Sequence, residues 1–282
     1  MAIEELGNEH SVSVLCETLH VSRSAYYAWR KDECGKRRSE DNHLKPMIRS
    51  IFWNHKRRYG ARRIAIALAA RGECCGRRRV RRLLDEMDLV AIQPRSFKPR
   101  TTDSRHTLGY SPNVLIGARP PDGPNQLWVG DITYVPVVGG EFVYLAMLMD
   151  RFSRRIIGWD LQESMEEILV LTALQAAIVS RRPKPGLVHH TDRGGQYAGV
   201  KYRNMLARAR MVQSMSRAKD CYDNAFMESC FGTIKRELEM NCYQNQRTAH
   251  KEITQFIRYY NTRRSHSSLG YLSPEQFEQV AE

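Results

Sequence analysis

The sequence predicts an α/β fold, in which a mixed five-stranded sheet flanked by helices follows small all-α modules. Three observations support this prediction. The N-terminal third shows only helix-type spacing of its apolar residues, a proline-rich stretch comes next, and β-branched runs then alternate with amphipathic ones. The last segment is again helical in pattern. We therefore predict five regions: residues 1–55, 56–92, 93–124, 125–245 and 246–282.

The composition predicts a globular protein. Of the 282 residues, 42% are hydrophobic and 9% are aromatic, which is enough for a sizeable core. The longest apolar run, FVYLAMLM at residues 142–149, is too short to span a bilayer, and the N-terminus has no basic start followed by an apolar segment. The seven cysteines include no C-x-x-C pair, which favours reduced thiols. We expect a cytoplasmic protein with no membrane partner.

The charge is strongly positive and unevenly distributed. The formal net charge is +13. Residues 1–120 hold 24 Lys and Arg against 13 Asp and Glu, whereas residues 121–282 hold 20 against 18. A local basic excess is typical of nucleic-acid binding. The alternative is a basic face kept for solubility, so a binding motif is needed to decide.

The first region contains a helix-turn-helix pattern. Residues 11–30 predict one helix, a tight turn at residues 19–21, and a second helix that is capped by Ser22 and carries Tyr26 and Trp29.

A second helix-turn-helix pattern follows in residues 59–90. Its apolar spacing predicts two helices on either side of a turn at Arg71 and Gly72. Basic helical hairpins also occur in proteins that never contact DNA, so the pattern alone leaves both interpretations open. Five arginines near the start of the second helix suit contact with DNA phosphates. They are Arg77, Arg78, Arg79, Arg81 and Arg82.

The helical pattern ends at Gln93. Six of the eleven prolines lie between this residue and Gln126, where apolar periodicity is lost. We therefore predict an extended linker over residues 93–124.

The fourth region predicts the sheet. Turns at Gly139-Gly140 and at RFSRR separate three antiparallel strands, and two further strands alternate with helices. The resulting order, β-β-β-α-β-α-β-α, describes a mixed sheet with helices on its faces and is the order found in ribonuclease H-like folds. The strands are expected at residues 127–138, 141–150, 156–161, 186–192 and 211–216, and the helices at 166–180, 197–209 and 223–237.

Three carboxylates are expected to meet at one end of this sheet. The first strand is central and holds Asp131, while Asp192 comes directly after the neighbouring fourth strand. Glu228 lies at the border of the apolar stripe of the last helix, with no Lys or Arg three or four residues away. We predict that this helix crosses the same edge, so that Glu228 faces the two aspartates.

Such a cluster predicts a site for divalent cations. Three neighbouring carboxylates repel one another, whereas two Mg²⁺ ions about 3.5–4 Å apart neutralise them and activate a water or a 3′-hydroxyl for attack on a phosphodiester. Hard oxygen ligands favour Mg²⁺ or Mn²⁺ over zinc. Lys235, two turns after Glu228, is placed to hold a phosphate of the DNA, and Asn224, one turn before Glu228, shares that edge.

Each carboxylate also has a structural interpretation. Asp131 could bond to Thr133, Asp192 could be a turn residue, and Glu228 could be a solvated helix residue. Only their combination in this order of strands and helices makes the cation site the better interpretation.

Three other polar residues are interpreted as structural. We predict that Asp150 forms a turn at the hairpin end and is not a fourth ligand. His189 and His190 alternate faces on a strand, so at most one points toward the site, and neither has partners for a zinc site or a catalytic triad at useful spacing.

Three motifs around the carboxylates carry a family resemblance. They are WVGDITY, HTDRGGQY and DNAFMESCFGTIKRE, and 35 residues separate Asp192 from Glu228. The patterns W-x-x-D-x-T-Y, H-S-D-R-G-x-Q-Y and D-N-A…E-S-x-F-x-x-L-K-x-E are typical of bacterial insertion-sequence transposases with a retroviral-integrase-like DDE core. The chain resembles the second product of the group encoded by two overlapping frames, over nearly its whole length. The differences at Thr191, Gly195 and Ile234 remove no ligand.

The resemblance implies a function and a set of partners. It implies that Asp131, Asp192 and Glu228 are the metal-binding catalytic triad, and that the chain cuts DNA at an element end and joins the freed 3′-hydroxyl to target DNA. The expected partners are terminal inverted repeats, target DNA, further copies of the chain on DNA, and an upstream-frame product or frameshift fusion. The expected location is the bacterial nucleoid. We place Arg193, next to Asp192, with the DNA-binding residues.

Two rival functions stay open. A DNA-binding regulator of transposition would bind element ends without cutting, and would be recognised by a missing carboxylate, but none is missing. A structure-selective nuclease of the same fold would cut without joining.

Overall fold

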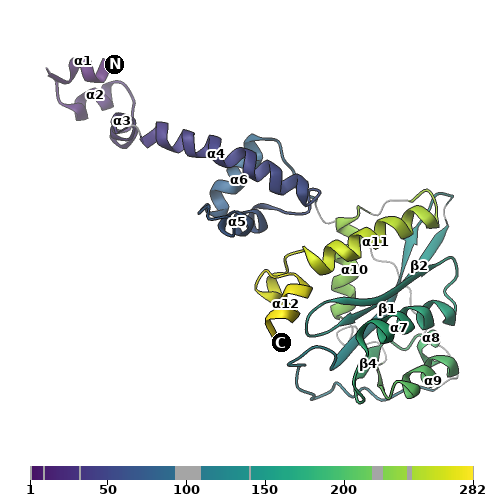
Figure 1. Ribbon diagram of the computed structural model, residues 1–282. Coiled ribbons are helices and arrows are strands. Elements are labelled where there is room, and N and C mark those ends of the chain that lie inside the picture. The colour runs from purple at the N-terminus through teal and green to yellow at the C-terminus, as the bar shows by residue number, and fades with distance from the viewer. Residues whose placement is uncertain are drawn as a thin grey trace. The chain divides into compact units, whose positions relative to one another are not determined.

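The computed structural model describes most of the chain, in two compact units. The units are Met1–Ile92 and Gln93–Glu282 (Figure 1). Among the described residues, no helix is both long and apolar enough to cross a membrane. The described residues are 2–8, 10–31, 33–92, 109–139, 141–217, 225–239 and 243–281.

The N-terminal unit starts with short helices. Two of them form the predicted helix-turn-helix: the Ser11 side chain accepts a hydrogen bond from the Val14 amide at 3.4 Å, and that of Ser22 accepts one from the Ala25 amide at 3.2 Å. These side chains satisfy amides that a helix start leaves unpaired, so the two serines fix where the helices begin. The elements are α1 (Ala2–Glu5), η1 (Leu6–Asn8), α2 (Val12–Thr18) and α3 (Arg23–Arg30).

A small helical core completes this unit. Helices α5 (Ala61–Ala69) and α6 (Arg77–Glu86) form the second predicted hairpin and pack against a long helix, α4 (Glu33–Asn54). The sequence interpretation did not identify α4, although its buried residues follow a helical spacing. These residues are Leu44, Ile48, Ile51 and Phe52.

The second unit is built on a five-stranded sheet of order β3-β2-β1-β4-β5. Strand β1 pairs with β2 antiparallel and with β4 parallel, so it is central. Pairing of β2 with β3 is antiparallel, and that of β4 with β5 is parallel. The predicted fold class is confirmed. The strands are β1 (Leu127–Pro136), β2 (Phe142–Asp150), β3 (Ile156–Gln162), β4 (Val188–Thr191) and β5 (Val212–Met215).

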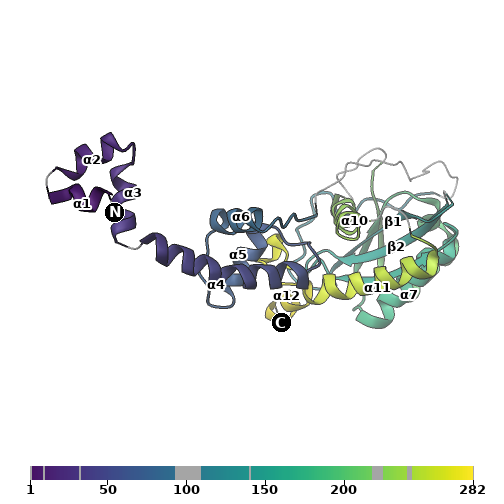
Figure 2. The same ribbon diagram turned by 90° about the horizontal axis from the view of Figure 1, so that it is seen from above.

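Helices cover both faces of this sheet. One face packs on α7 (Glu167–Arg181), α8 (Gly195–Ala198) and α9 (Val200–Arg208). The other face packs on α10 (Ala225–Glu237) and α11 (Gln246–Thr262), which lie beside β1 and β2 in Figures 1 and 2. Because strand side chains alternate, neighbouring residues of β1 enter different cores: Trp128 packs toward α7 and Val129 toward α10.

The prediction of one helix over residues 197–209 was wrong. The structure has α8 and α9, divided at Gly199, whose ψ of 147° is not helical. A Cβ atom at this position would lie 2.0 Å from Oε1 of Glu167 on α7, which also accepts a hydrogen bond from the Tyr202 amide of α9 at 3.3 Å, so a side chain here would have to displace Glu167.

Helix α7 approaches the sheet most closely at Gly158 of β3. A Cβ atom there would lie 2.3 Å from the carbonyl oxygen of Ala173 and 2.8 Å from the Cβ of Ala177. The absence of a side chain therefore sets the distance between helix and strand.

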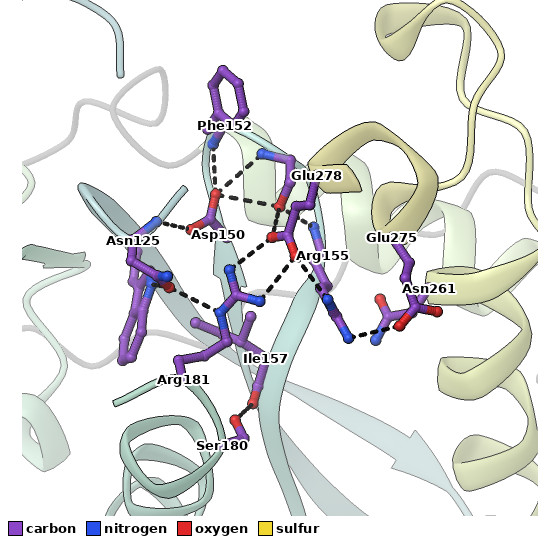
Figure 3. Close-up of polar contacts among 12 residues, drawn as sticks. Asn125, Asp150, Phe152, Arg155, Ile157, Ser180, Arg181, Asn261, Glu275 and Glu278 are labelled. Atoms are coloured by element: carbon purple, nitrogen blue, oxygen red, sulfur yellow. Dashed lines mark hydrogen bonds and ion pairs between the residues drawn. The ribbon is translucent and has the colours of Figure 1, made fainter. Parts of the chain in front are cut away.

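The end of the β2–β3 hairpin is closed by a polar cluster that reaches the last helix, α12 (Pro274–Ala281) (Figure 3). Asp150, fully buried, accepts hydrogen bonds from the amides of Asn125 (2.6 Å), Phe152 (3.0 Å) and Ser153 (3.1 Å). The prediction that Asp150 is a turn-forming residue is confirmed.

Glu278 of α12 is the centre of the same cluster. Its carboxylate oxygens accept from Arg181 at 2.8 and 2.9 Å, from Arg155 at 2.7 Å and from the Ser153 hydroxyl at 2.8 Å. Burial raises the pKa of Glu278, but the hydrogen bonds from Arg181, Arg155 and Ser153 outweigh it and hold the pKa below its ordinary value. The cluster joins α12 to α7 and to the hairpin.

The described part of the predicted linker follows the sheet edge. The Ser111 hydroxyl donates to Gln213 of β5 at 2.8 Å, and the Val114 amide donates to the Ser214 hydroxyl at 3.1 Å. Residues 93–108 lie outside the described residues. Between Gly109 and Gln126 the chain forms turns and no helix or strand.

Candidate active site

The two aspartates come from neighbouring parallel strands. The register pairs Leu127 with Val188 and Val129 with His190, so that its continuation by two residues sets Asp131 opposite Asp192. An oxygen of Asp131 accepts from the Ile132 amide at 2.8 Å, and one of Asp192 accepts from the Gly194 amide at 3.0 Å. Each carboxylate is thereby oriented by a backbone amide that follows it closely in the chain.

Glu228 is carried to the same end of β1 by α10. The apolar stripe of α10 packs on β1 and β2 through Met227, Cys230, Phe231 and Ile234, as predicted, while Glu228 stays exposed at its border. The helix therefore has one face fixed in the core and one carboxylate at the rim of the sheet.

The electrostatics of Asp131 show that the three carboxylates share one region. Burial raises the pKa of Asp131 well above its ordinary value, and Asp192 and Glu228 raise it further, whereas the Ile132 amide and Lys235 oppose the shift. An excess of negative charge of this kind is what a bound cation relieves, and the donors are all oxygen atoms, which suit Mg²⁺ or Mn²⁺.

The three carboxylates do not form a closed ligand set. Within the described ranges, no group of three or more His, Cys, Asp or Glu side chains is close enough to hold a metal ion. The donor chemistry thus fits a hard divalent cation, although the three carboxylates are not gathered closely enough to enclose one.

Tyr197 lies beside the aspartates and was missed by the sequence interpretation. It is buried on α8, packs edge-on against Tyr202 at 5.4 Å between ring centroids, and burial together with Asp131, Tyr202 and Asp192 raises its pKa well above the ordinary value. Its place in HTDRGGQY, five residues after Asp192, was the available signal. As a neutral phenol it forms a wall of the site.

Lys235 lies over the ring of Tyr134, with Nζ 4.1 Å from the ring centroid. Tyr134 is on β1, three residues after Asp131, and packs edge-on against Phe142 at 5.1 Å. Burial lowers the pKa of Lys235, and the charge of Asp131 partly offsets this. The lysine is therefore held next to the aspartate by an aromatic platform that the sequence interpretation did not assign.

The two histidines of β4 contact hydroxyl groups of neighbouring elements and have a structural role, as far as the described residues show. The Nε2 atom of His189 lies 2.7 Å from the Tyr202 hydroxyl. His190 contacts the hydroxyls of Ser214 at 2.8 Å and Ser216 at 3.2 Å. Burial, followed by the neighbouring His190, lowers the pKa of His189 to about 3. His189 is therefore neutral at neutral pH, and the hydrogen bonds of the two histidines link β4 to α9 and to β5.

Arg193 is held next to the site. Its Nε donates to the carbonyl of Ser216 at 2.7 Å, and its guanidinium carbon lies 4.7 Å from the centroid of the Tyr110 ring. Asn224, also predicted to bind DNA, lies outside the described residues.

The five arginines of α6 fall into two groups. Arg79 and Arg82 are partly buried and form ion pairs with Asp41 of α4, at 2.7 and 2.6 Å. Arg79 also pairs with Glu40, and Arg82 with Glu86. These contacts join α6 to α4. The three that stay exposed to solvent are Arg77, Arg78 and Arg81.

Comparison with protein families identifies three matching regions. Residues 121–221 and 209–274 each match an integrase core domain, and residues 39–97 match a helix-turn-helix-like domain.

Two curated relatives match over nearly the whole chain. A 31 kDa protein of the insertion element IS600 from Shigella sonnei is 40% identical, over 93% of this chain and 97% of the relative. The transposase InsF of the insertion sequence IS3A from Escherichia coli K12 is 36% identical, over 98% of this chain and 96% of the relative.

Solved structures show the same core fold. A simian T-cell lymphotropic virus intasome in complex with the PP2A regulatory subunit B56 gamma is similar with a TM-score of 0.50 and 14% identity, over 82% of this chain and 74% of the other. The HTLV-2 integrase catalytic core domain, solved in complex with magnesium, is 17% identical with a TM-score of 0.44, over 55% of this chain and 97% of that domain.

Proposed function

The chain belongs to the family of InsF-like insertion-sequence transposases with an integrase core domain, and from this premise we propose that it cuts and joins DNA at the ends of its own element. In the proposed reaction, hydrolysis of a phosphodiester frees a 3′-hydroxyl at the element end. That hydroxyl then attacks a phosphodiester of the target DNA, and the target's own 3′-oxygen leaves. No bond forms between protein and DNA.

Asp131, Asp192 and Glu228 are the proposed cation ligands. Bound Mg²⁺ or Mn²⁺, two ions in this proposal, would supply charge neutralisation and Lewis acidity. The two aspartates, each oriented by a backbone amide, form the fixed part of the site. Glu228 completes the site when α10 brings its exposed carboxylate nearer to them. Lys235 holds a phosphate of the strand that is cut.

One observation carries the proposal. In a chain of this family, the charges of Asp192 and Glu228 both raise the pKa of Asp131, although the three residues come from different elements of the fold. If the three residues had unrelated structural roles, their charges would not be expected to act on one another.

The first testable prediction concerns Glu228→Gln. Loss of one negative oxygen ligand should lower the rates of strand cleavage and joining on the order of a thousandfold or more, because a metal ligand supplies several kcal/mol of charge stabilisation. The measurement uses labelled DNA of the element's own ends with Mg²⁺ or Mn²⁺.

A matched control is Glu252→Gln, an exposed glutamate of α11 outside the site. It should cut and join as the natural protein does, and both variants should bind DNA with little change. Joined products from Glu228→Gln at the natural rate would remove Glu228 from the triad.

A second candidate is a regulator that binds element ends without cutting. It is favoured by the lack of a closed group of three metal ligands among the residues that the structure describes. Binding of element ends without any metal-dependent product, also after an upstream-frame part is added, would support it. Cutting without joining would instead support a structure-selective nuclease.

We further propose a division of labour between the regions. Residues 56–92 bind DNA through Arg77, Arg78 and Arg81, which are free of the ion pairs that occupy Arg79 and Arg82. Residues 125–245 hold the chemistry, joined to the N-terminal regions by the linker at 93–124 and extended by residues 246–282. Several copies act together on the nucleoid DNA.

A further inference from the structure

Two arginines that pack against the first turn of α10 have no acidic partner among the described residues. Arg151 and Arg154 belong to the turn between β2 and β3, and both are half-buried. Their neighbour Arg155 is engaged with Glu278 and Glu275, and Arg181 with Glu278, whereas neither Arg151 nor Arg154 forms an ion pair or a side-chain hydrogen bond in the described part of the chain.

Both guanidiniums lie against one aromatic ring. The Cζ atom of Arg151 is 3.3 Å from the ring centroid of Phe226, and that of Arg154 is 4.1 Å from it. Phe226 is the second residue of α10 and precedes Glu228 by two positions. We call Arg151 and Arg154, together on this ring, the guanidinium pair.

The guanidinium pair is electrostatically unfavourable as it stands. Burial, followed by repulsion from Arg154, lowers the pKa of Arg151 to about 10, and burial lowers that of Arg154. Contact with the Phe226 ring offsets part of the unfavourable electrostatic energy but neutralises neither charge. Two half-buried cations on one aromatic ring, with no anionic partner in the part of the chain that the structure describes, fit a binding site for an anionic ligand.

We propose that the guanidinium pair binds a phosphodiester of DNA at the start of α10, the helix that carries Glu228. The proposal rests on the function proposed above. Arginine presents a planar fork of donors that matches two phosphate oxygens, and Phe226 fixes both forks at the helix that carries Glu228. Binding of the phosphate would at the same time position the start of α10, and so the glutamate.

The test compares the full-length chain with Arg151→Gln, Arg154→Gln and the double variant. Binding of a short fluorescent DNA duplex is measured without divalent cations, between roughly 50 and 200 mM salt, where the logarithm of affinity falls by about 0.9 per contacted phosphate for each tenfold increase in salt. The double variant should lose about one to two units of this slope and bind about tenfold more weakly at the low-salt end.

Arg208→Gln is the matched control, because Arg208 is an exposed arginine on α9, on the other face of the sheet. It removes the same charge as either single variant and should leave the slope unchanged. An equal loss in Arg208→Gln and in the single variants would mean that net charge alone matters, and an unchanged slope in the double variant would overturn the proposal.

Thermal unfolding distinguishes a ligand site from a packing contact. Because the pair repels itself in the free protein, Arg154→Gln should keep the Tm at or above that of the natural chain. A lower Tm with natural DNA affinity would assign the pair to packing and overturn the proposal.

If the double glutamine variant does not fold, Arg151→Lys with Arg154→Lys takes its place. These changes keep both positive charges but remove the planar guanidinium groups. The salt dependence of DNA binding should therefore stay the same, while the affinity drops severalfold. Unchanged affinity would also overturn the proposal. Since none of these measurements needs cleavage, a chain that binds DNA through the pair but never cuts would contradict the proposed catalysis alone.

Discussion

At the scale of residues, the candidate site is asymmetric. Asp131 is held in the sheet and Asp192 is half-buried at the end of β4, whereas Glu228 is exposed on a helix. Two of the proposed ligands therefore belong to the sheet and its end, and the third depends on how α10 is placed. We expect residues that fix α10 against β1 to affect activity almost as strongly as the proposed ligands themselves.

Tyr134 provides a prediction at this scale. Tyr134→Leu removes the ring beneath Lys235, and loss of a partly desolvated cation–π contact of about 1 kcal/mol should weaken DNA binding about fivefold. Tyr134→Phe keeps the ring and should bind like the natural chain. Affinity titrations at fixed salt make the comparison, with Tm values to confirm that both variants are folded. A loss as large in Tyr134→Phe would assign the effect to the hydroxyl.

The candidate site residues could be proposed from the sequence, whereas the residues that pack around them could not. Asp131, Asp192 and Glu228 could be proposed because strand order and apolar periodicity place them at one end of a sheet. The roles of Tyr134 and Tyr197 could not be predicted in this way. Tyr134 depends on its contact with Lys235 of α10 and Tyr197 on its position near Asp131 and Asp192, and no local sequence pattern indicates either. Likewise, no local pattern distinguishes an arginine that pairs with α4 from one that faces solvent.

At the scale of elements, two glycines test how closely helices approach. Gly158→Ala would place a methyl group 2.3 Å from the Ala173 carbonyl, so α7 must move, and the free energy of unfolding should fall by about 3 kcal/mol or more. Gly232→Ala on α10 has open space and should raise it by about 0.5–1 kcal/mol. Urea denaturation measures both. Similar values for the two variants would show that α7 has room to shift.

Strands were easier to predict than helix boundaries. The β-branched runs and the Gly139-Gly140 turn identify the hairpin strands, because a half-buried strand needs only alternation and a turn. The long α4 contains Pro46, which removes a backbone donor and argues against a continuous helix, although the apolar stripe continues on both sides of it. The break at Gly199 depends on Glu167, which lies in another helix.

At the scale of the whole molecule, the Glu278 cluster predicts a pH dependence. Glu278 has a folded-state pKa below its ordinary value of 4.5, so its stabilising contribution is present above that value and is lost as pH falls through the folded pKa. Glu278→Gln should cost about 3 kcal/mol of unfolding free energy at neutral pH, because it leaves partly buried arginine charge uncompensated, and the cost should shrink as pH falls below 4.5 through the folded-state pKa.

Denaturation curves of natural and variant chains at several pH values measure this difference. Asp150, whose pKa is raised by burial and also by the neighbouring Glu278 charge, contributes with the opposite sign, and the part that depends on Glu278 is included in the measured difference. Glu275→Gln is the control, because the Arg155–Glu275 pair is more exposed and should contribute under about 1 kcal/mol. A cost of Glu278→Gln that does not change with pH would show that charge is not its cause.

The Glu278 cluster also orders events during translation. Ser153 and Arg181 leave the ribosome before their partner Glu278 does, since Ser153 precedes Glu278 by 125 positions. The N-terminal unit, by contrast, contains its own core and can fold while the remainder is being made. A nascent chain therefore completes the core of its helix-turn-helix-like region before its integrase core is stable. Under the proposed function, messages or ribosomes that stop early would release proteins able to occupy element ends but not to cut them.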